Sequence, residues 1–146
     1  MPEQPKLQAV LDTNVFVSGL MGVVSPPRQI VNAWLDGDFI LVTSLYLIDE
    51  LNHVLSYPRI VDRLRVSDAE VEAILAALLS QAEMVPGKLK LPGVTRDPKD
   101  DPVVACAVEG KADYIVSGDQ DLLVLEIFQG VQIITPRQFV ELISNL

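Results

Sequence analysis

Short apolar runs alternate with helical patterns along most of the chain. Four runs are close to continuously apolar, which is typical of strands that are covered on both faces of a parallel sheet. These runs are Leu7–Leu11, Phe39–Thr43, Tyr114–Ser117 and Val131–Ile134. A shorter run, Glu83–Val85, ends at Pro86-Gly87 and is expected to form an edge strand.

Helix start and stop signals lie between these runs. One segment, Ser67 to Glu70, has the spacing of a capping box and precedes apolar residues at helical period. Other expected starts are Ser25-Pro26, Ser44, Asp101-Pro102 and Thr135-Pro136, and the expected stops are Gly37 and Gly110. This order of elements predicts an α/β fold, a three-layer α/β/α sandwich with right-handed crossovers.

The length of 146 residues suits one domain with a sizeable core, and we expect residues 1–146 to form a single domain. No apolar run approaches the roughly 18 residues of a membrane span. The start, Met1-Pro2-Glu3, lacks the pattern of a signal peptide. The single cysteine, Cys106, cannot form an internal disulfide, so we expect a cytoplasmic protein.

Charge narrows the possible functions. The chain has 11 basic and 20 acidic residues, a net charge of −9. This balance argues against a simple basic nucleic-acid binder, whose affinity comes from released counterions. It is compatible with an enzyme that gathers metal cations on a cluster of acids.

Acidic residues stand where the predicted strands end. Asp12 follows the first strand, and Asp119 and Asp121 follow the strand 114–117. Asp101 begins the helix that leads into that strand. Functional groups of such sheets gather beyond the carboxyl ends of the strands, so we expect these acids to converge there.

Helix geometry adds Glu50 to this set. With Leu47 set at 0° and a step of about 100° per residue, Glu50 falls near −60°, at the border of the apolar stripe, whereas Asp49 falls near 200°. A carboxylate at such a border is costly unless a cation or another group compensates it. The lone histidine, His53, falls on the outer side of the same helix and is interpreted as a surface residue, and Cys106 as a core residue.

Each acid also has a purely structural interpretation. Asp12 could belong to a turn or cap the segment that follows it, and Asp101 could be an N-cap before Pro102. Asp119 could cap the helix containing Leu122, and Glu50 could be a half-exposed surface acid. Together, however, four mutually repelling acids indicate a cation or proton chemistry. Carboxylates without cysteine or histidine clusters favour Mg²⁺ or Mn²⁺.

The ordered set of motifs resembles the PIN domain family over nearly the whole chain. The motifs are Val10-Leu11-Asp12-Thr13-Asn14, Ser44 to Leu51 with Glu50, Arg96-Asp97-Pro98-Lys99-Asp100-Asp101-Pro102, and Ala112 to Leu123 with Ser117-Gly118-Asp119-Gln120-Asp121. Within the family, the chain is most similar to compact prokaryotic toxins of toxin–antitoxin pairs.

The resemblance implies a metal-dependent ribonuclease with a parallel sheet in the order 3-2-1-4-5. It assigns Asp12, Glu50, Asp101 and Asp119 to an acidic site for one or two Mg²⁺ or Mn²⁺ ions. Asp97 and Asp100 compete with Asp101 for the third place, and Asp121 is a further possible ligand. The residues expected to support these ligands by hydrogen bonds are Thr13, Asn14 and Ser117.

The expected substrate is single-stranded RNA, and the expected protein partners are an antitoxin and a second copy of the chain. Candidate phosphate contacts are Arg59, Arg63 and Arg65 after the Glu50 helix, and Lys88, Lys90, Arg96 and Lys99 before Asp101. An ordinary solvated surface explains these basic residues equally well.

Two other classes of protein stay open. A phosphoryl-transfer domain could use Asp12 as nucleophile, although Asn14 and Thr135 stand where two such families place an Asp and a Lys. A non-catalytic module could use the same acids to bind a metal or a protein.

Overall fold

The computed structural model describes residues 6–22 and 24–145, so Met1-Pro2-Glu3, on which the expectation about a signal peptide rests, lies outside the described residues. Six strands of the described chain form one sheet in the order β3-β2-β1-β4-β6-β5. The strands are β1 (Gln8–Leu11), β2 (Ile40–Thr43), β3 (Glu83–Met84), β4 (Tyr114–Val116), β5 (Ile127–Phe128) and β6 (Val131–Ile134). All pairs are parallel except β5 with β6. The five strands expected from the sequence lie in the expected order.

The helices are α1 (Thr13–Met21), α2 (Pro26–Leu35), α3 (Leu45–Val54), α4 (Pro58–Val61), α5 (Asp68–Gln81), α6 (Asp101–Glu109), α7 (Gln120–Leu123) and α8 (Pro136–Ser144). The expected caps are present: Ser25, Ser44 and Ser67 each accept a hydrogen bond from the backbone N–H three residues later. The capping box predicted at Ser67 is only half formed, because the Ser67 hydroxyl itself donates to the Glu70 carboxylate. A complete box lies at Thr135 of α8.

Strand β5 was absent from the sequence expectations. Both of its residues, Ile127 and Phe128, are apolar, but two residues are too few to form a recognisable strand pattern. A two-residue turn joins it to β6, with φ of 47° at Gln129 and 85° at Gly130. Positive φ at both positions is the geometry of a type I′ hairpin, for which Gln-Gly is a weak sequence signal.

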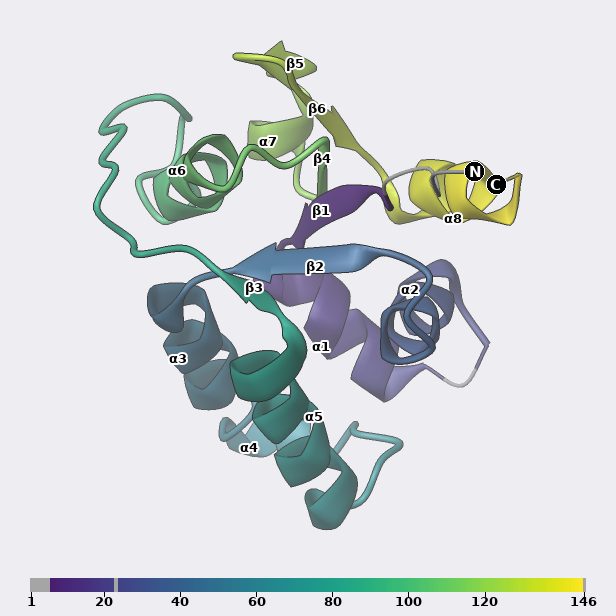
Figure 1. Ribbon diagram of the computed structural model, residues 1–146. Coiled ribbons are helices and arrows are strands. Elements are labelled where there is room, and N and C mark those ends of the chain that lie inside the picture. Colours follow the sequence, from purple (N-terminus) through teal and green to yellow (C-terminus); the bar gives the residue numbers. More distant parts are fainter. Residues whose placement is uncertain (1–5, 23, 146) are drawn as a thin grey trace.

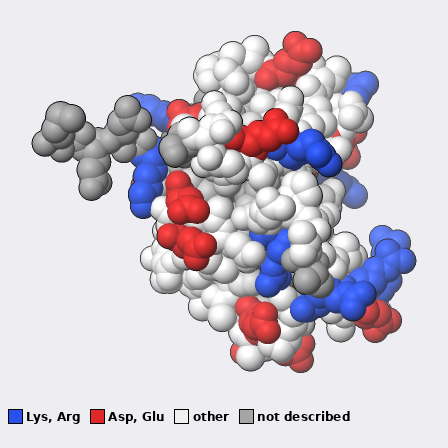
Figure 2. Space-filling view, turned by 90° about the vertical axis from the view of Figure 1, so that its right-hand side faces the viewer, with Lys and Arg blue, Asp and Glu red and all other residues white. Residues whose placement is uncertain are grey.

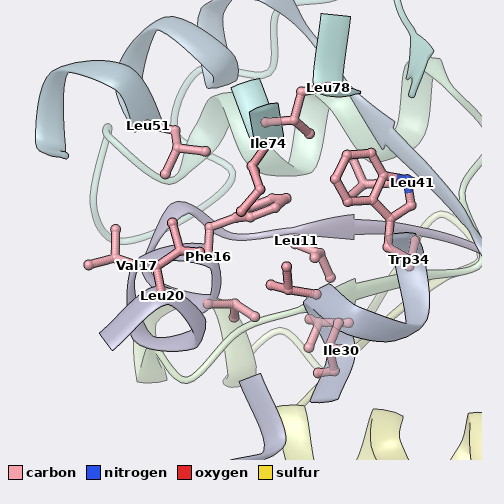
Figure 3. Packing of buried hydrophobic residues seen from close by; sticks show 14 of the residues in the cluster. Leu11, Phe16, Val17, Leu20, Ile30, Trp34, Leu41, Leu51, Ile74 and Leu78 are labelled. Atoms are coloured by element: carbon pink, nitrogen blue, oxygen red, sulfur yellow. The ribbon is translucent and has the colours of Figure 1, made fainter. Parts of the chain in front are cut away.

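Helices cover both faces of the sheet (Figure 1). Alternate strand residues enter two separate cores: Leu11 and Leu41 belong to one, Val10 and Val42 to the other. Figure 3 shows the first core, in which side chains of α1, α2, α3 and α5 meet the sheet. Phe139 of α8 completes it, packing edge-to-face on Phe39. The second core lies under α6 and α7, and includes Val103, Val104 and Leu122.

The C-terminal end of helix α6, at the predicted stop Gly110, packs closely against the sheet. A Cβ at this position would lie 2.6 Å from Val42 Cγ1 and 2.9 Å from Val85 Cγ1, so glycine permits the approach. Among the described residues, no helix has the length and apolarity needed to cross a membrane.

Candidate metal centre

Asp12 and Ser117 lie side by side where the two central strands end. The pairing of β1 with β4 places Leu11 opposite Val116, and Asp12 N–H donates to the Val116 carbonyl at 3.0 Å. The buried Ser117 hydroxyl donates to Asp12 Oδ2 at 2.8 Å. Burial raises the pKa of Asp12, whereas the hydrogen bond from Ser117 lowers it by a smaller amount. The negative charges of Asp119 and Glu50 raise the pKa further.

Ser117 also connects Asp12 to Asp119. Its hydroxyl oxygen accepts a hydrogen bond from Asp119 N–H at 2.9 Å. Asp119 Oδ1 in turn accepts from Asp121 N–H at 2.9 Å and caps α7. The capping interpretation of Asp119 is therefore confirmed, and the same residue lies near enough to Asp12 to raise its pKa.

Glu50 reaches this edge of the sheet from α3. It is half-buried, whereas Asp49 is exposed, as the helix geometry predicted. The Thr13 hydroxyl, at the start of α1, donates to Glu50 Oε2 at 3.0 Å. Because Thr13 directly follows Asp12, this bond holds Glu50 beside the end of β1.

The structure brings Asp100 to the other acids. Asp100 stands immediately before α6 and is only 8% exposed, and its side chain makes no capping hydrogen bond. Its buried Oδ2 has no hydrogen-bond partner among the described residues. Burial, followed by Asp119, Asp12 and Asp97, raises the pKa of Asp100 to about 7.

Asp101 points elsewhere, which corrects the choice of Asp101 over Asp100. Its Oδ1 accepts from the Thr95 N–H at 2.9 Å and the Thr95 hydroxyl at 2.7 Å, and its Oδ2 from Gly93 N–H at 2.9 Å. These bonds, chiefly the one from the Thr95 hydroxyl, lower the pKa of Asp101. Pro102 is the second residue of α6, so Asp101 is its first residue and not its N-cap. Successive side chains of a helix point about 100° apart, so a shift of one residue along α6 changes the direction in which the carboxylate points.

Two further acids border the centre on its outer side. Carboxylate oxygens of Asp97, Asp100 and Asp121 lie within 4.8 Å of one another. Asp121 Oδ1 pairs with Arg96 Nη2 at 2.9 Å, and both side chains are partly exposed. Asp100 therefore links this outer group to Asp12 and Asp119.

The three expected supporting residues differ in position. Ser117 and Thr13 contact the acids directly, through Asp12 and Glu50 respectively. Asn14 is exposed on the first turn of α1, and its supporting role stays a prediction.

The residues present fit a divalent cation. Their donor atoms are carboxylate oxygens, which suit hard ions. The unpartnered Asp100 Oδ2 is a buried acceptor that a cation would satisfy. The mutual repulsion that raises the pKa values of Asp12 and Asp100 would be relieved by the same ion.

The basic candidates fall into two groups. Lys88, Lys90, Arg96 and Lys99 are exposed on the segment that leads to Asp100. Arg65 N–H instead bonds the Leu20 carbonyl, about 12 Å along α1 from Asp12 at 1.5 Å per residue. Figure 2 shows basic side chains on the face at the right of Figure 1, the side on which α2 and α8 lie.

The comparisons with known proteins agree with this architecture. The chain is 26% identical over 147 residues to the uncharacterized protein MJ1680 of Methanocaldococcus jannaschii, covering 95% of this chain and 93% of that protein. The family model of the PIN domain matches residues 8–121, which include β1, Glu50, Asp100 and Asp119. The chain therefore belongs to the PIN domain family.

Proposed function

We propose that this protein is a metal-dependent endoribonuclease that hydrolyses single-stranded RNA with one or two Mg²⁺ or Mn²⁺ ions. The ligands are Asp12, Glu50, Asp100 and Asp119, with Asp97 and Asp121 at the outer side. The observation that carries the proposal is the buried, unpartnered oxygen of Asp100 beside carboxylates that raise its pKa. Membership of a family whose members are generally metal-dependent nucleases supports the same chemistry.

Charge explains how these residues act. When ionised, the four ligands carry four negative charges and repel a phosphodiester. A bound divalent cation supplies positive charge for the scissile phosphate and lowers the pKa of a water molecule. Ser117 and Thr13 hold Asp12 and Glu50 in fixed orientations through their hydroxyl groups. Exposed Lys99, which directly precedes Asp100, is the candidate contact for a neighbouring phosphate, whereas Lys88 is tethered to Glu109, about 12 Å along α6 from Asp101.

The test is cleavage of a fluorescently labelled single-stranded RNA with Mn²⁺, Mg²⁺ or EDTA. We expect cleavage only with a divalent cation, and its loss in Asp12→Asn and Asp100→Asn. Asp49→Asn, which removes a charge from an exposed position of the Glu50 helix, is the matched control and retains activity. Circular dichroism spectra establish that each variant is folded.

Metal binding has its own measurement. A cation that binds only the folded protein raises the free energy of unfolding by about 2.7 kcal/mol at a hundredfold excess over its Kd. An unchanged melting temperature at millimolar Mn²⁺ would exclude a preformed site. A folded, Mn²⁺-binding protein without RNA cleavage would indicate the non-catalytic module, and a trapped phospho-aspartate at Asp12 a phosphoryl-transfer domain.

The resemblance to compact prokaryotic toxins extends the proposal. In this extension the protein acts in the cytoplasm as a homodimer, and an antitoxin protein inhibits it. Induced expression of the wild-type chain should then arrest bacterial growth, and expression of Asp12→Asn should not. Growth that is unaffected by an RNA-cleaving wild-type protein would refute the toxin role alone.

A further inference from the structure

Two acids of α6 hold the segment that crosses over this helix. We call residues 85–99, between β3 and Asp100, the strap; Figure 1 shows it leaving β3 and arching around α6. Glu109 accepts hydrogen bonds from the N–H groups of Gly87, Lys88 and Leu89, at 2.9, 3.1 and 3.3 Å. Asp101 holds the other part of the strap through Gly93 and Thr95.

A cleft of about 380 Å³ lies between these two attachments. Asp101, Ala105 and Glu109 are spaced four residues apart, so they share one side of α6 and all line the cleft. Strap residues Leu89 and Leu91 form an apolar wall opposite them. The two tethers therefore fix the width of the cleft.

An exposed aromatic ring lines the cleft. Tyr46, on the first turn of α3, is 59% exposed and lines both this cleft and an adjoining hollow of about 390 Å³. The two hollows also share Ser44 and Val85, so they lie next to each other. Lys90 from the strap is exposed and adds a positive charge.

The cleft adjoins the candidate metal centre. Its lining residue Asp101 directly follows Asp100, and Pro98 directly follows Asp97. Ser44 caps the helix that carries Glu50. The cleft therefore begins beside the first turn of α6, next in the chain to the acids of the centre.

We propose that the cleft binds an unpaired nucleobase of the RNA strand whose phosphate lies at the metal centre. This inference rests on the proposed nuclease function. The cleft volume is in the range of pockets for small ligands, and its lining is mostly apolar with a few polar groups. Tyr46 offers a ring face for stacking, and Lys90 a cation for the attached phosphate.

The cleft lining carries one basic residue, Lys90, and two acids, Asp101 and Glu109, whose carboxylates already accept hydrogen bonds from N–H groups of the strap. Lys88, Lys90 and Lys99 are exposed along the strap beside the cleft. The acid nearest to Lys88 and Leu89, Glu109, is occupied by backbone N–H groups. A nucleotide joins a flat base to an anionic phosphate, and it therefore matches an apolar cleft with exposed lysines beside it.

The first test compares Tyr46→Ala with Tyr46→Phe, and uses Tyr57→Ala as a matched control. Tyr57 is also an exposed tyrosine, 40% exposed, and it does not line the cleft. For Mn²⁺-dependent cleavage of a short single-stranded RNA, we expect Tyr46→Ala to raise KM by about 5- to 100-fold. We expect kcat to stay unchanged because stacking positions the substrate without contacting the reacting atoms. Tyr46→Phe keeps the ring and should resemble the wild type, as should Tyr57→Ala.

The same RNA, made abasic at one position at a time, identifies the bound base. One abasic position should raise KM for the wild type about as much as Tyr46→Ala does, and it should add nothing in that variant. Additive effects of the two changes, or an unchanged KM in Tyr46→Ala, would overturn the proposal.

Binding of free nucleotides separates this proposal from the nuclease proposal. When nucleoside 5′-monophosphates are titrated into ¹⁵N-labelled wild-type protein, amide shifts should concentrate at Tyr46, Leu89 and Ala105, and should vanish in Tyr46→Ala. These shifts without RNA cleavage would support the base site while refuting the nuclease. Their absence, or shifts located elsewhere, would overturn the base site even in a protein that cleaves RNA.

Discussion

Removing the charge of Asp100 is expected to stabilise the protein when no divalent cation is present. Asp100→Asn keeps the size of the side chain and deletes a buried carboxylate that Asp119, Asp12 and Asp97 repel. Below the unfolded pKa near 3.8, wild-type Asp100 is neutral in both states. As the pH rises toward the folded pKa of about 7, the unfolded state ionises first and is favoured.

The magnitude follows from the size of the shift. The pKa rises from 3.8 to about 7, and each pH unit corresponds to about 1.4 kcal/mol, so the penalty above pH 7 is at most about 4 kcal/mol. Neighbouring carboxylates share this repulsion, and the asparagine amide must itself find partners. We therefore expect Asp100→Asn to raise the free energy of unfolding by about 1 to 4 kcal/mol at pH 8.

Urea unfolding in EDTA measures this difference. Trp34 is the single tryptophan and is 5% exposed, so its fluorescence reports the loss of the core. The gain should shrink as the pH falls from 8 to 3, where the Asp100 carboxyl is largely neutral in both the folded and the unfolded state. Asp49→Asn removes one charge from an exposed position and should change stability by no more than about 0.5 kcal/mol.

Added Mn²⁺ should reverse the ranking. The wild type gains stability by binding the ion, whereas Asp100→Asn lacks one of the ligands. The reasoning is refuted if Asp100→Asn is less stable than the wild type in EDTA at pH 8, because repulsion at Asp100 would then be absent.

Three further substitutions test neighbouring features. Asp101→Ala should destabilise the protein by about 1–3 kcal/mol at pH 7 in EDTA because it leaves N–H groups of the strap unpaired. Because the pKa of Asp101 is lowered in the folded protein, urea unfolding should show that this loss of stability fades as the pH falls below 4. Ser117→Ala removes the hydroxyl between Asp12 and Asp119, so calorimetry should show about 10- to 100-fold weaker Mn²⁺ binding; an unchanged Kd would contradict this role. Gly110→Ala should cost about 1–3 kcal/mol by thermal unfolding, through its contact with Val42 at 2.6 Å; wild-type stability would mean that the helix end shifts freely.

Long, strongly patterned elements could be predicted from the sequence. The apolar runs around Val10 and Val42 are buried on both faces, because neighbouring residues enter different cores. Ser25-Pro26 and Gly37 located both ends of α2 to within two residues, and Ser67 located the start of α5. The strand order came from the family resemblance, since periodicity alone does not determine which strands pair.

Some short elements could not be predicted, although the edge strand β3, which also has two residues, was. Strand β5 is two residues long and partly exposed, and its pairing depends on a turn with positive φ at Gln129. Helix α1 begins directly after Asp12, and its start has no capping hydrogen bond from that side chain. Such elements form because the surrounding fold positions them, so local sequence carries little information about them.

The acids of the candidate site could be predicted from the sequence except for one choice between neighbouring residues, Asp100 and Asp101. Helix geometry distinguished Glu50 from Asp49 because α3 has a clear apolar stripe. In α6 the proline misleads: proline commonly occupies the first helical position, so Pro102 favours Asp101 as the residue before the helix, whereas Pro102 is the second helical residue. The four-residue spacing of Asp101 from Ala105 and Glu109, on the side that faces the strap, is the signal that would have selected Asp100.

The double attachment of the strap makes part of this protein suitable for engineering by loop exchange. Residues 90–92 lie between the anchors supplied by Glu109 and Asp101, and none of them bonds the acids at the strand ends. Loop libraries confined to these positions, with both anchors retained, should alter which molecules enter the cleft. Cation affinity should meanwhile persist across such a library, so the two properties could be selected separately.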